Sequence, residues 1–316
     1  MPDPVSCAYC LNPLNGESGP YHADCCRRLF ASLSPPVLPY SRDDLNKLAE
    51  QVVQRHVTVP GVQPKLSLHL EAADTGHRRL TLVGMEGGFI LKPPVPAYPE
   101  MPELEHVTLR MADAMGIETA PGGLIPLQDG PWAFISRRMD RDGSRKRHME
   151  DMCQLTDRLT ERKYSGSLEQ IGRVIWRHCA NPGFDVLRLF ELTIFCFLTG
   201  NADMHLKNFS LLYDLGCPVR LAPAYDLLPT ALLMPEDQED TALTLHGKKR
   251  RLRRNDFYHL AQALRLTARQ ADNAFSRISQ RLPAAVDTLM NGLCSTDAKQ
   301  RYSALFHQRS IHLDMA

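Results

Sequence analysis

The stretch of sequence that most restricts the fold is FDVLRLFELTIFCFLTG, residues 184–200. Apolar residues occur on almost every side of the helix that it would form, and such a helix has to be enclosed by other parts of the protein. The chain contains no run of about 18 uncharged apolar residues, so we expect no membrane span. A buried central helix needs a large core around it, and 316 residues are enough for two lobes with separate cores.

The two halves of the chain differ in their periodicity. Before residue 148 the pattern is mainly that of strands, with helical spacing at 41–55, after the candidate cap Ser41, and at 102–116. After residue 148 the spacing is helical, at 148–159, 168–179, 184–200 and in four stretches from about 255 to the C-terminus. We therefore predict an α+β, bilobal fold with an N-terminal β-rich lobe and a C-terminal all-helical lobe. The expected parts are a small Cys/His-containing segment (1–40), an N-terminal lobe (41–145) and a C-terminal lobe (146–316).

Charge and cysteine usage narrow the functional class. Lys plus Arg is 37 and Asp plus Glu is 36, so the net charge of +1 gives no support to a general nucleic-acid or membrane-surface binder. The N-terminus, MPDPVSCAYC, lacks the basic start and apolar core of a secretory signal. An odd number of cysteines, nine, with five widely scattered, fits reduced thiols better than a disulfide framework. We therefore expect a cytoplasmic protein.

The polar loop directly after the apolar stretch contains the strongest chemical signal. Asp203 and Asn208 have the spacing D-x-x-x-x-N, in which protein kinases use the Asp to accept the proton of the attacking hydroxyl and the Asn to hold Mg²⁺. Asp226 follows 18 residues after Asn208, at a distance where a kinase carries its other metal-binding Asp. This pattern predicts phosphoryl transfer, although Asp and Asn also occur in such loops simply as turn formers.

Two residues of the first half extend this pattern. Lys92 ends the apolar strand FILK, where kinases place the lysine that contacts the nucleotide phosphates, and Glu105 in the next helix could orient it. Taken singly, a strand-end Lys is usually a solvated edge charge and a helix Glu a surface carboxylate. The order Lys, Glu, Asp-Asn, Asp favours a kinase. Because G-x-x-x-x-G-K-[ST] and G-x-G-x-x-G are both missing from the sequence, a Walker-type NTPase and an ordinary eukaryotic-type kinase are disfavoured.

Four motifs resemble, in the same order, those of the HipA family of bacterial toxin kinases. They are Gly-Val-Gln-Pro-Lys at 61–65, Phe-Ile-Leu-Lys-Pro at 89–93, Gly-Asn-Ala-Asp-Met-His-Leu-Lys-Asn-Phe at 200–209 and Ala-Pro-Ala-Tyr-Asp-Leu at 222–227. The resemblance covers residues 56–310. Within the family, the length of the chain is most similar to that of HipT, the short kinase of the three-part HipBST toxin–antitoxin systems.

The resemblance implies a protein-kinase-like fold and a site that uses ATP and Mg²⁺. Asp203 would be the catalytic base, Asn208 and Asp226 would hold magnesium, and Glu105 would orient Lys92. Thr58 matches a hydroxyl that is autophosphorylated in the family, although it also suits a β-branched strand position. The residues that would contact ATP are Pro60, Gly61, Val62, Gln63, Pro64, Lys65, Lys92, the hinge Arg137, Arg138 and Met139, His205, Leu206, Lys207, Asn208, Tyr225, Asp226, Leu227 and Leu228.

A second group of residues has the ligand types and spacing of a structural zinc site. Cys7, Cys10, His22 and Cys25 form C-x2-C-x11-H-x2-C, in a segment too short to bury a core of its own. Cys26 competes with Cys25 for the fourth ligand position. The alternative interpretation is that these residues are ordinary loop cysteines.

A basic run of six cations in seven residues, 248–254, follows the acidic segment 236–240. A charge run is usually a solvated face, and the functional interpretation is docking to an acidic partner or to nucleic acid.

These features predict a serine/threonine protein kinase, and the resemblance implies that it is a toxin that phosphorylates a translation-related protein. The resemblance implies an aminoacyl-tRNA synthetase as target, antitoxins of the HipB and HipS type as partners, and contact with DNA only through the antitoxin. Two alternatives stay open: a small-molecule kinase with the same site, and a non-enzymatic nucleic-acid or partner-binding module.

Overall fold

A computed structural model describes residues 6–16, 19–55, 64–72, 78–83, 87–143, 145–213 and 216–315. The chain forms two compact units. Unit 1 consists of residues 1–110, 120–144 and 291–295, and unit 2 consists of residues 111–119, 145–290 and 296–316. The division into a segment 1–40 and two lobes, 41–145 and 146–316, stays a prediction.

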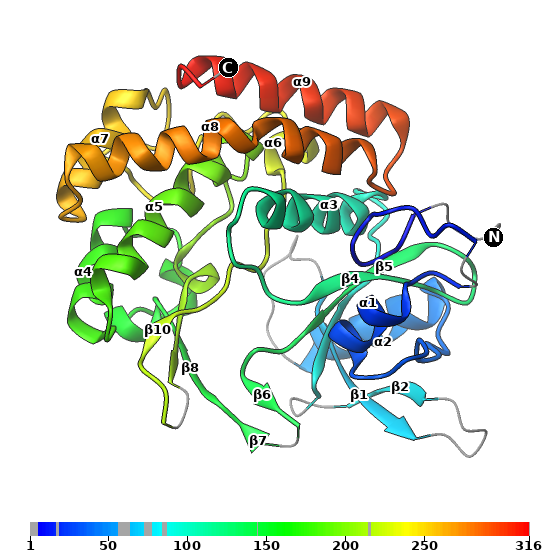
Figure 1. Ribbon diagram of the computed structural model, residues 1–316. Coiled ribbons are helices and arrows are strands. Elements are labelled where there is room, and N and C mark those ends of the chain that lie inside the picture. Colours follow the sequence, from blue (N-terminus) through cyan, green and yellow to red (C-terminus); the bar gives the residue numbers. More distant parts are fainter. Residues whose placement is uncertain are drawn as a thin grey trace. The chain divides into compact units, whose positions relative to one another are not determined.

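Unit 1 is built on a five-stranded sheet in the order β2-β1-β3-β5-β4, with every neighbouring pair antiparallel (Figure 1). The inner strand β3 pairs Leu91 with Ile135 and Lys92 with Phe134. Alternate residues of these strands, such as Leu68, Leu80 and Leu91, are fully buried, which is the expected result of a period of two on a sheet with a covered face. The strands are β1 (Leu66–Ala72), β2 (Arg78–Leu82), β3 (Phe89–Lys92), β4 (Gly122–Pro126) and β5 (Trp132–Arg137).

The helices of this part of the chain are α1 (Ala23–Phe30), α2 (Arg42–Arg55) and α3 (Met101–Ala114). Helix α2 begins where the sequence predicts, because the side chain of Ser41 accepts from the backbone N–H of Asp44 (3.2 Å) and the carboxylate of Asp44 accepts from that of Ser41 (2.9 Å). Helix α3 lies close to the sheet. A Cβ atom at Gly122 would be 2.7 Å from Phe134 and 3.0 Å from Leu109 of α3, so only glycine fits there.

Unit 2 is mainly helical, as predicted, and α5 (Pro182–Thr199) is its central helix. Side chains around the whole circumference of α5, including those of Phe190, Phe195 and Leu198, have no exposed surface. Helix α5 contacts α4, α8 and α9, which confirms the enclosed helix expected from the apolar stretch. The other helices are α4 (Leu168–His178), α6 (Thr230–Leu233), α7 (Arg254–Ala263), α8 (Ala268–Met290) and α9 (Thr296–His312), with short 3₁₀ turns η1 (Gln154–Thr156), η2 (Thr160–Arg162) and η3 (Leu206–Asn208).

Unit 2 also contains a three-stranded sheet in the order β10-β9-β8, so it is not wholly helical. The predicted helix at 148–159 is wrong, because β8 (His148–Asp151) pairs antiparallel with β9 (Ser210–Tyr213). Strand pairing with a distant segment satisfies the backbone of these residues and overrides their helical spacing. Strand β10 (Arg220–Leu221) completes the sheet, and β6 (Arg141–Asp142) and β7 (Arg145–Lys146) follow β5 in the chain.

The C-terminal region differs from the prediction in a second respect. Four helical stretches were expected from about residue 255, whereas the structure has α7, α8 and α9. Residues 268–290 form one long helix that runs through Pro283, although proline normally ends or kinks a helix.

The end of α5 gives a testable prediction about stability. Gly200 has φ of 68°, and a Cβ atom there would lie 2.9 Å from both Ala231 and Leu305. Replacing Gly200 by Ala should therefore lower the free energy of unfolding by about 1–2 kcal/mol or more. Gly183→Ala in the first turn of α5 is the control, because open space surrounds that position and helix propensity favours Ala by up to about 1 kcal/mol. Urea unfolding of both variants tests this, and equal effects would contradict it.

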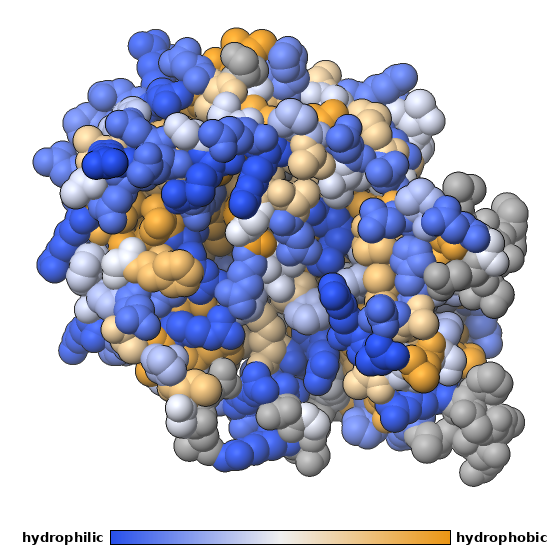
Figure 2. Space-filling model, viewed as in Figure 1, coloured by the Kyte–Doolittle hydropathy of each residue, from blue (hydrophilic) through white to orange (hydrophobic). Residues whose placement is uncertain are grey.

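On the face shown in Figure 2, hydrophilic residues predominate and hydrophobic residues show between them in small groups. Among the described residues, every helix is either too short or too polar to cross a lipid bilayer.

Candidate active site

The loop after α5 is held by hydrogen bonds to the first turn of α6. The backbone N–H of Ala202 donates to Thr230 Oγ1 (2.8 Å), and the backbone N–H of Ala231 donates to the carbonyl of Gly200 (3.0 Å). Thr230 is buried, so these bonds are protected from water. The start of the loop 201–208 is thereby fixed to the segment that follows Asp226.

Asp203 lies at the centre of a compact turn. Its backbone N–H donates to Asn201 Oδ1 (3.1 Å), and its carbonyl accepts from the backbone N–H of His205 (2.8 Å) and from Asn208 Nδ2 (3.0 Å). Since a carbonyl can only accept, the amide nitrogen of Asn208 must face Asp203 and its Oδ1 must be the other end of the amide. Oδ1 is an oxygen ligand of the kind that Mg²⁺ prefers.

Tyr164 is a site residue that the sequence analysis missed. Its hydroxyl donates to Asp203 Oδ1 (2.6 Å), and its ring meets that of His205 edge-on with centroids 5.2 Å apart. Burial raises the pKa of Tyr164, and so do its hydrogen bond to Asp203 and the negative charges of Asp203 and Asp226. The hydroxyl of Tyr164 thus links the segment before α4 to the loop that contains Asp203.

Asp226 follows the β9–β10 hairpin and has a left-handed backbone, with φ of 58°. That conformation costs free energy for a residue other than glycine, and such residues cluster at functional sites. The neighbouring Tyr225 hydroxyl donates to the carbonyl of Lys207 (2.9 Å) and accepts from the hydroxyl of Ser210 (2.7 Å). Tyr225 thus ties the segment containing Asp226 to the loop containing Asn208.

The remaining predicted residues of unit 2 lie within these loops or directly after Asp226. His205, Leu206 and Leu227 are buried. Lys207 forms an ion pair with Asp151 of β8, with Nζ and Oδ2 2.8 Å apart. Leu228 accepts a backbone hydrogen bond from Thr230 (2.9 Å).

In unit 1, the structure brings Lys92 and Glu105 together. Lys92 Nζ lies 2.5 Å from Glu105 Oε1, and the two residues are only 4% and 1% exposed. Their charges attract strongly because little water screens them, and removing either partner would leave the other buried without its counter-charge. The geometry is that expected for a lysine held in place by a helix carboxylate, while its role with phosphate stays a prediction.

Some of the other residues predicted in unit 1 belong to the described part of the chain, and some do not. Pro64 and the exposed Lys65 directly precede β1, whereas Thr58 and 60–63 lie outside the described residues. Arg137 ends β5, and Arg138 forms a bidentate ion pair with Asp140 (2.8 and 2.7 Å) before the chain leaves the sheet. Burial would raise the pKa of Asp140, but the hydrogen bond and charge of Arg138 outweigh burial and lower it.

The four predicted zinc ligands form a cluster. One ligand atom from each of Cys7, Cys10, His22 and Cys25 lies within 4.8 Å of all the others. His22 Nδ1 lies 3.3 Å from Cys10 Sγ, while His22 Nε2 is 3.0 Å from the carbonyl of Pro13. Because that carbonyl can only accept, Nε2 carries the proton and Nδ1 is the nitrogen that faces the thiols. The cluster contains Cys25 and not its rival Cys26.

Two of the six cations in the basic run 248–254 form ion pairs within unit 2. Lys248 contacts Asp256 (2.7 Å), and Lys249 contacts Glu239 of the acidic segment (3.4 Å). Burial would raise the pKa of Asp256, but hydrogen bonds from Lys248 and His246 outweigh burial and lower it to about 2. These pairs favour the interpretation of the run as an ion-paired face over a docking site for nucleic acid.

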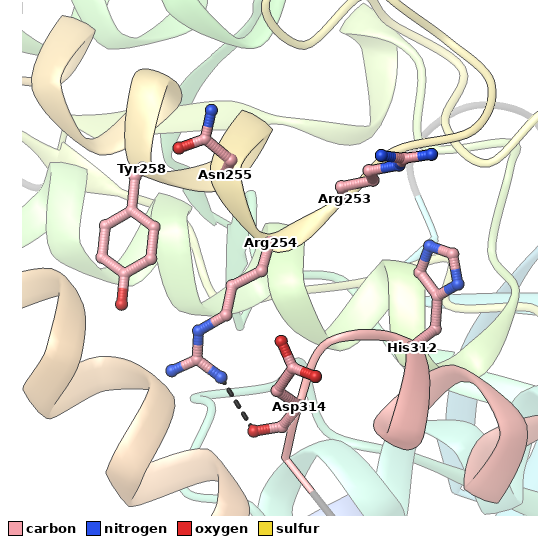
Figure 3. Close-up of a pocket in the computed structure, with 6 residues that line it drawn as sticks. All are labelled: Arg253, Arg254, Asn255, Tyr258, His312 and Asp314. Carbon is pink, nitrogen blue, oxygen red and sulfur yellow. Dashed lines mark hydrogen bonds between the residues drawn. The ribbon is translucent and has the colours of Figure 1, made fainter.

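A pocket of about 480 Å³ lies at the end of this run, lined by Arg253, Arg254, Asn255, Tyr258, His312 and Asp314 (Figure 3). Arg254 Nη1 donates to the carbonyls of Leu313 (2.7 Å) and Asp314 (2.9 Å), and its guanidinium lies 4.2 Å from the ring centroid of Phe275. Arg254 of α7 therefore binds the backbone of residues 313–314 and also contacts α8.

Comparison with known proteins finds relatives that are named as kinases. A protein of Haemophilus influenzae named as a putative kinase is 31% identical over 222 residues, which cover 66% of this chain and 63% of the relative. The serine/threonine-protein kinase toxin HipA of Shewanella oneidensis is 25% identical over 228 residues, which cover 60% of this chain and 51% of HipA. The chain thus spans between about half and two thirds of the length of these relatives.

The fold is also that of a solved HipA. HipA of Shewanella oneidensis MR-1, in a complex with HipB and operator DNA, superposes with a TM-score of 0.65 at 21% identity, over 83% of this chain and 68% of the other. This likeness confirms the α+β, kinase-like fold class. The sequence profile of the HipA-like C-terminal domain family matches residues 57–286, more than half of the chain. The chain therefore belongs to the HipA-like C-terminal domain family.

Proposed function

We propose that this protein is an ATP- and Mg²⁺-dependent serine/threonine protein kinase that acts as the toxin of a toxin–antitoxin system. The observation that carries the proposal is the convergence of Asp203, Asn208 and Asp226 on two loops that Thr230 and Tyr225 fasten together. The names of the relatives, a kinase and a serine/threonine-protein kinase toxin, support it.

Each residue has a defined task in this reaction. The carboxylate of Asp203 accepts the proton of the attacking hydroxyl while that oxygen forms a bond to the γ-phosphorus and the bond to ADP breaks. Asn208 Oδ1 and the carboxylate of Asp226 supply the oxygen ligands for magnesium, which offsets phosphate charge when it is bound. Lys92, oriented by Glu105, binds the phosphates. The remaining ATP contacts are Pro60 to Lys65, Arg137 to Met139, His205 to Lys207, Tyr225, Leu227 and Leu228.

The partners and control of the toxin follow by analogy. The solved HipA is bound to HipB and operator DNA, so we infer an antitoxin of the HipB or HipS type and contact with DNA only through it. The substrate is a translation-related protein such as an aminoacyl-tRNA synthetase. Phosphorylation of Thr58 would add about −1.5 to −2 charge beside the nucleotide phosphates and so oppose ATP binding.

Transfer from γ-labelled ATP in a cell extract tests the proposal. The purified chain with Mg²⁺ should place the label on one protein of the extract, and mass spectrometry should identify that protein and check Thr58. Label found only in small molecules would support a small-molecule kinase instead. ATP that stays intact would favour the non-enzymatic alternative.

The hydrogen bond from Tyr164 gives a prediction about the base. Tyr164→Phe should lower kcat about three- to tenfold with little change in the KM for ATP, because the Asp203 carboxylate loses the bond that holds one of its oxygens. Tyr258→Phe is a matched control, since its hydroxyl makes a similar 2.6 Å bond to Asp272 away from these loops. Equal losses in the two variants would show that Tyr164 has no special relation to the reaction.

We also propose that the Cys/His cluster holds one structural zinc ion. Elemental analysis of the purified chain should find about one zinc per molecule, as for a Cys₃His site. Cys25→Ala should lose the metal, whereas Cys26→Ala should keep it, because only Cys25 belongs to the cluster. Stoichiometric zinc in both variants, or in neither, would exclude this ligand set.

A further inference from the structure

We propose that the Cys/His segment, when it holds its metal, is a clamp on helix α3 that fixes Glu105 against Lys92. The effect on catalysis depends on the proposed kinase function, but the clamp itself can be tested without it. All the contacts that carry the proposal lie within unit 1.

The metal would join two parts of the segment that are separate in the sequence. Cys7 and Cys10 lie on one tight turn, while His22 is the N-cap of α1 and Cys25 lies in its first turns. Helix α1 is anchored to the sheet, because Phe30 is buried and its ring centroid lies 5.9 Å from that of Phe89. A metal bound to all four residues would therefore hold the turn 7–10 against an element already fixed to the sheet.

The two residues between Cys7 and Cys10 contact both β4 and α3 of unit 1. The carbonyl of Ala8 accepts from the backbone N–H of Leu124 in β4 (2.8 Å). The carbonyl of Tyr9 accepts from His106 Nε2 in α3 (2.9 Å), and the guanidinium of Arg110 lies 4.8 Å from the Tyr9 ring centroid. The same turn thus carries two metal ligands and the docking contacts for α3.

His106 is the neighbour of Glu105 in α3, and both are almost completely buried. The Tyr9 carbonyl can only accept, so His106 must donate through Nε2. If the turn lost its metal and moved, a buried donor would lose its acceptor, which is costly. Helix α3 would then shift or loosen next to Glu105, and the 2.5 Å ion pair with Lys92 would lose its geometry.

Hydrogen exchange of the 316-residue chain, with and without zinc, tests the clamp. Removing zinc with a chelator should speed amide exchange in residues 101–110 of α3 about tenfold, as expected for the loss of one buried hydrogen bond. Exchange in α9 should not change, because α9 belongs to unit 2. Unchanged exchange in α3, or equal acceleration in α3 and α9, would overturn the proposal.

Two variants of His106 show whether the effect of zinc on α3 depends on the hydrogen bond between His106 and Tyr9. With zinc bound, His106→Leu should speed α3 exchange about as much as zinc removal does, and removing zinc from this variant should add little. His106→Gln keeps an N–H donor and should stay close to the parent chain. Additive effects of zinc removal and His106→Leu would contradict a shared clamp.

The exchange measurement distinguishes failure of the clamp from failure of the proposed function. If the chain transfers no phosphate, the α3 result stands by itself. If the chain is an active kinase and the amide exchange rate of α3 is the same with and without zinc, only the clamp is wrong.

Discussion

Replacing Asp203 by Asn should lower the rate of phosphoryl transfer by about 10²- to 10⁴-fold, the usual contribution of a general base. An amide cannot take the proton of the attacking hydroxyl, yet it has nearly the same size and can still accept the hydrogen bond from Tyr164. The backbone of Asp203, which binds Asn201, His205 and Asn208, would be unchanged. Steady-state transfer from labelled ATP measures the loss, and urea unfolding should show a native-like free energy.

Asp157→Asn is a suitable control for this prediction. Asp157 has a left-handed backbone, with φ of 53°, at the end of η1, and asparagine tolerates that conformation well. The same chemical change there should leave the transfer rate unaltered. Full activity of the Asp203 variant would end its assignment as the base, whatever its effect on stability.

Local signals in the sequence were sufficient where a single segment determines its own structure. The apolar circumference of 184–200 predicted the enclosed helix α5, and the Ser41–Asp44 pair predicted the start of α2. The loops with Asp203 and Asp226 could be paired from spacing alone, because a short hairpin separates them and returns the chain to nearly the same place.

Contacts between distant segments could not be predicted in this way. Residues 148–151 form a strand only because 210–213 lie beside them, and Tyr164 reaches Asp203 across 39 positions. The choice between Cys25 and Cys26 depends on which side of α1 each occupies, and the pairing of the basic run depends on the fold of the segment before it. These are properties of the packed chain rather than of any one stretch.

The buried ion pair gives the second large effect. Lys92→Met should remove most of the transfer activity and lower the free energy of unfolding by about 3–5 kcal/mol, because Glu105 is left as a buried charge without its counter-charge. Arg301→Met, which breaks the exposed Arg301–Asp297 pair, should hardly change stability. Urea unfolding and the transfer assay measure the two quantities separately.

The double variant Lys92→Met with Glu105→Leu shows whether Lys92 has a role beyond stability. Apolar residues of similar volume often replace a buried ion pair with little loss of stability. The double variant should therefore unfold at a higher urea concentration than Lys92→Met alone. Transfer activity should nevertheless stay low, because neither apolar side chain can bind phosphate. If activity returned together with stability, the pair would serve only to hold α3 on the sheet, and the phosphate contact would have to be sought among other cations of the chain.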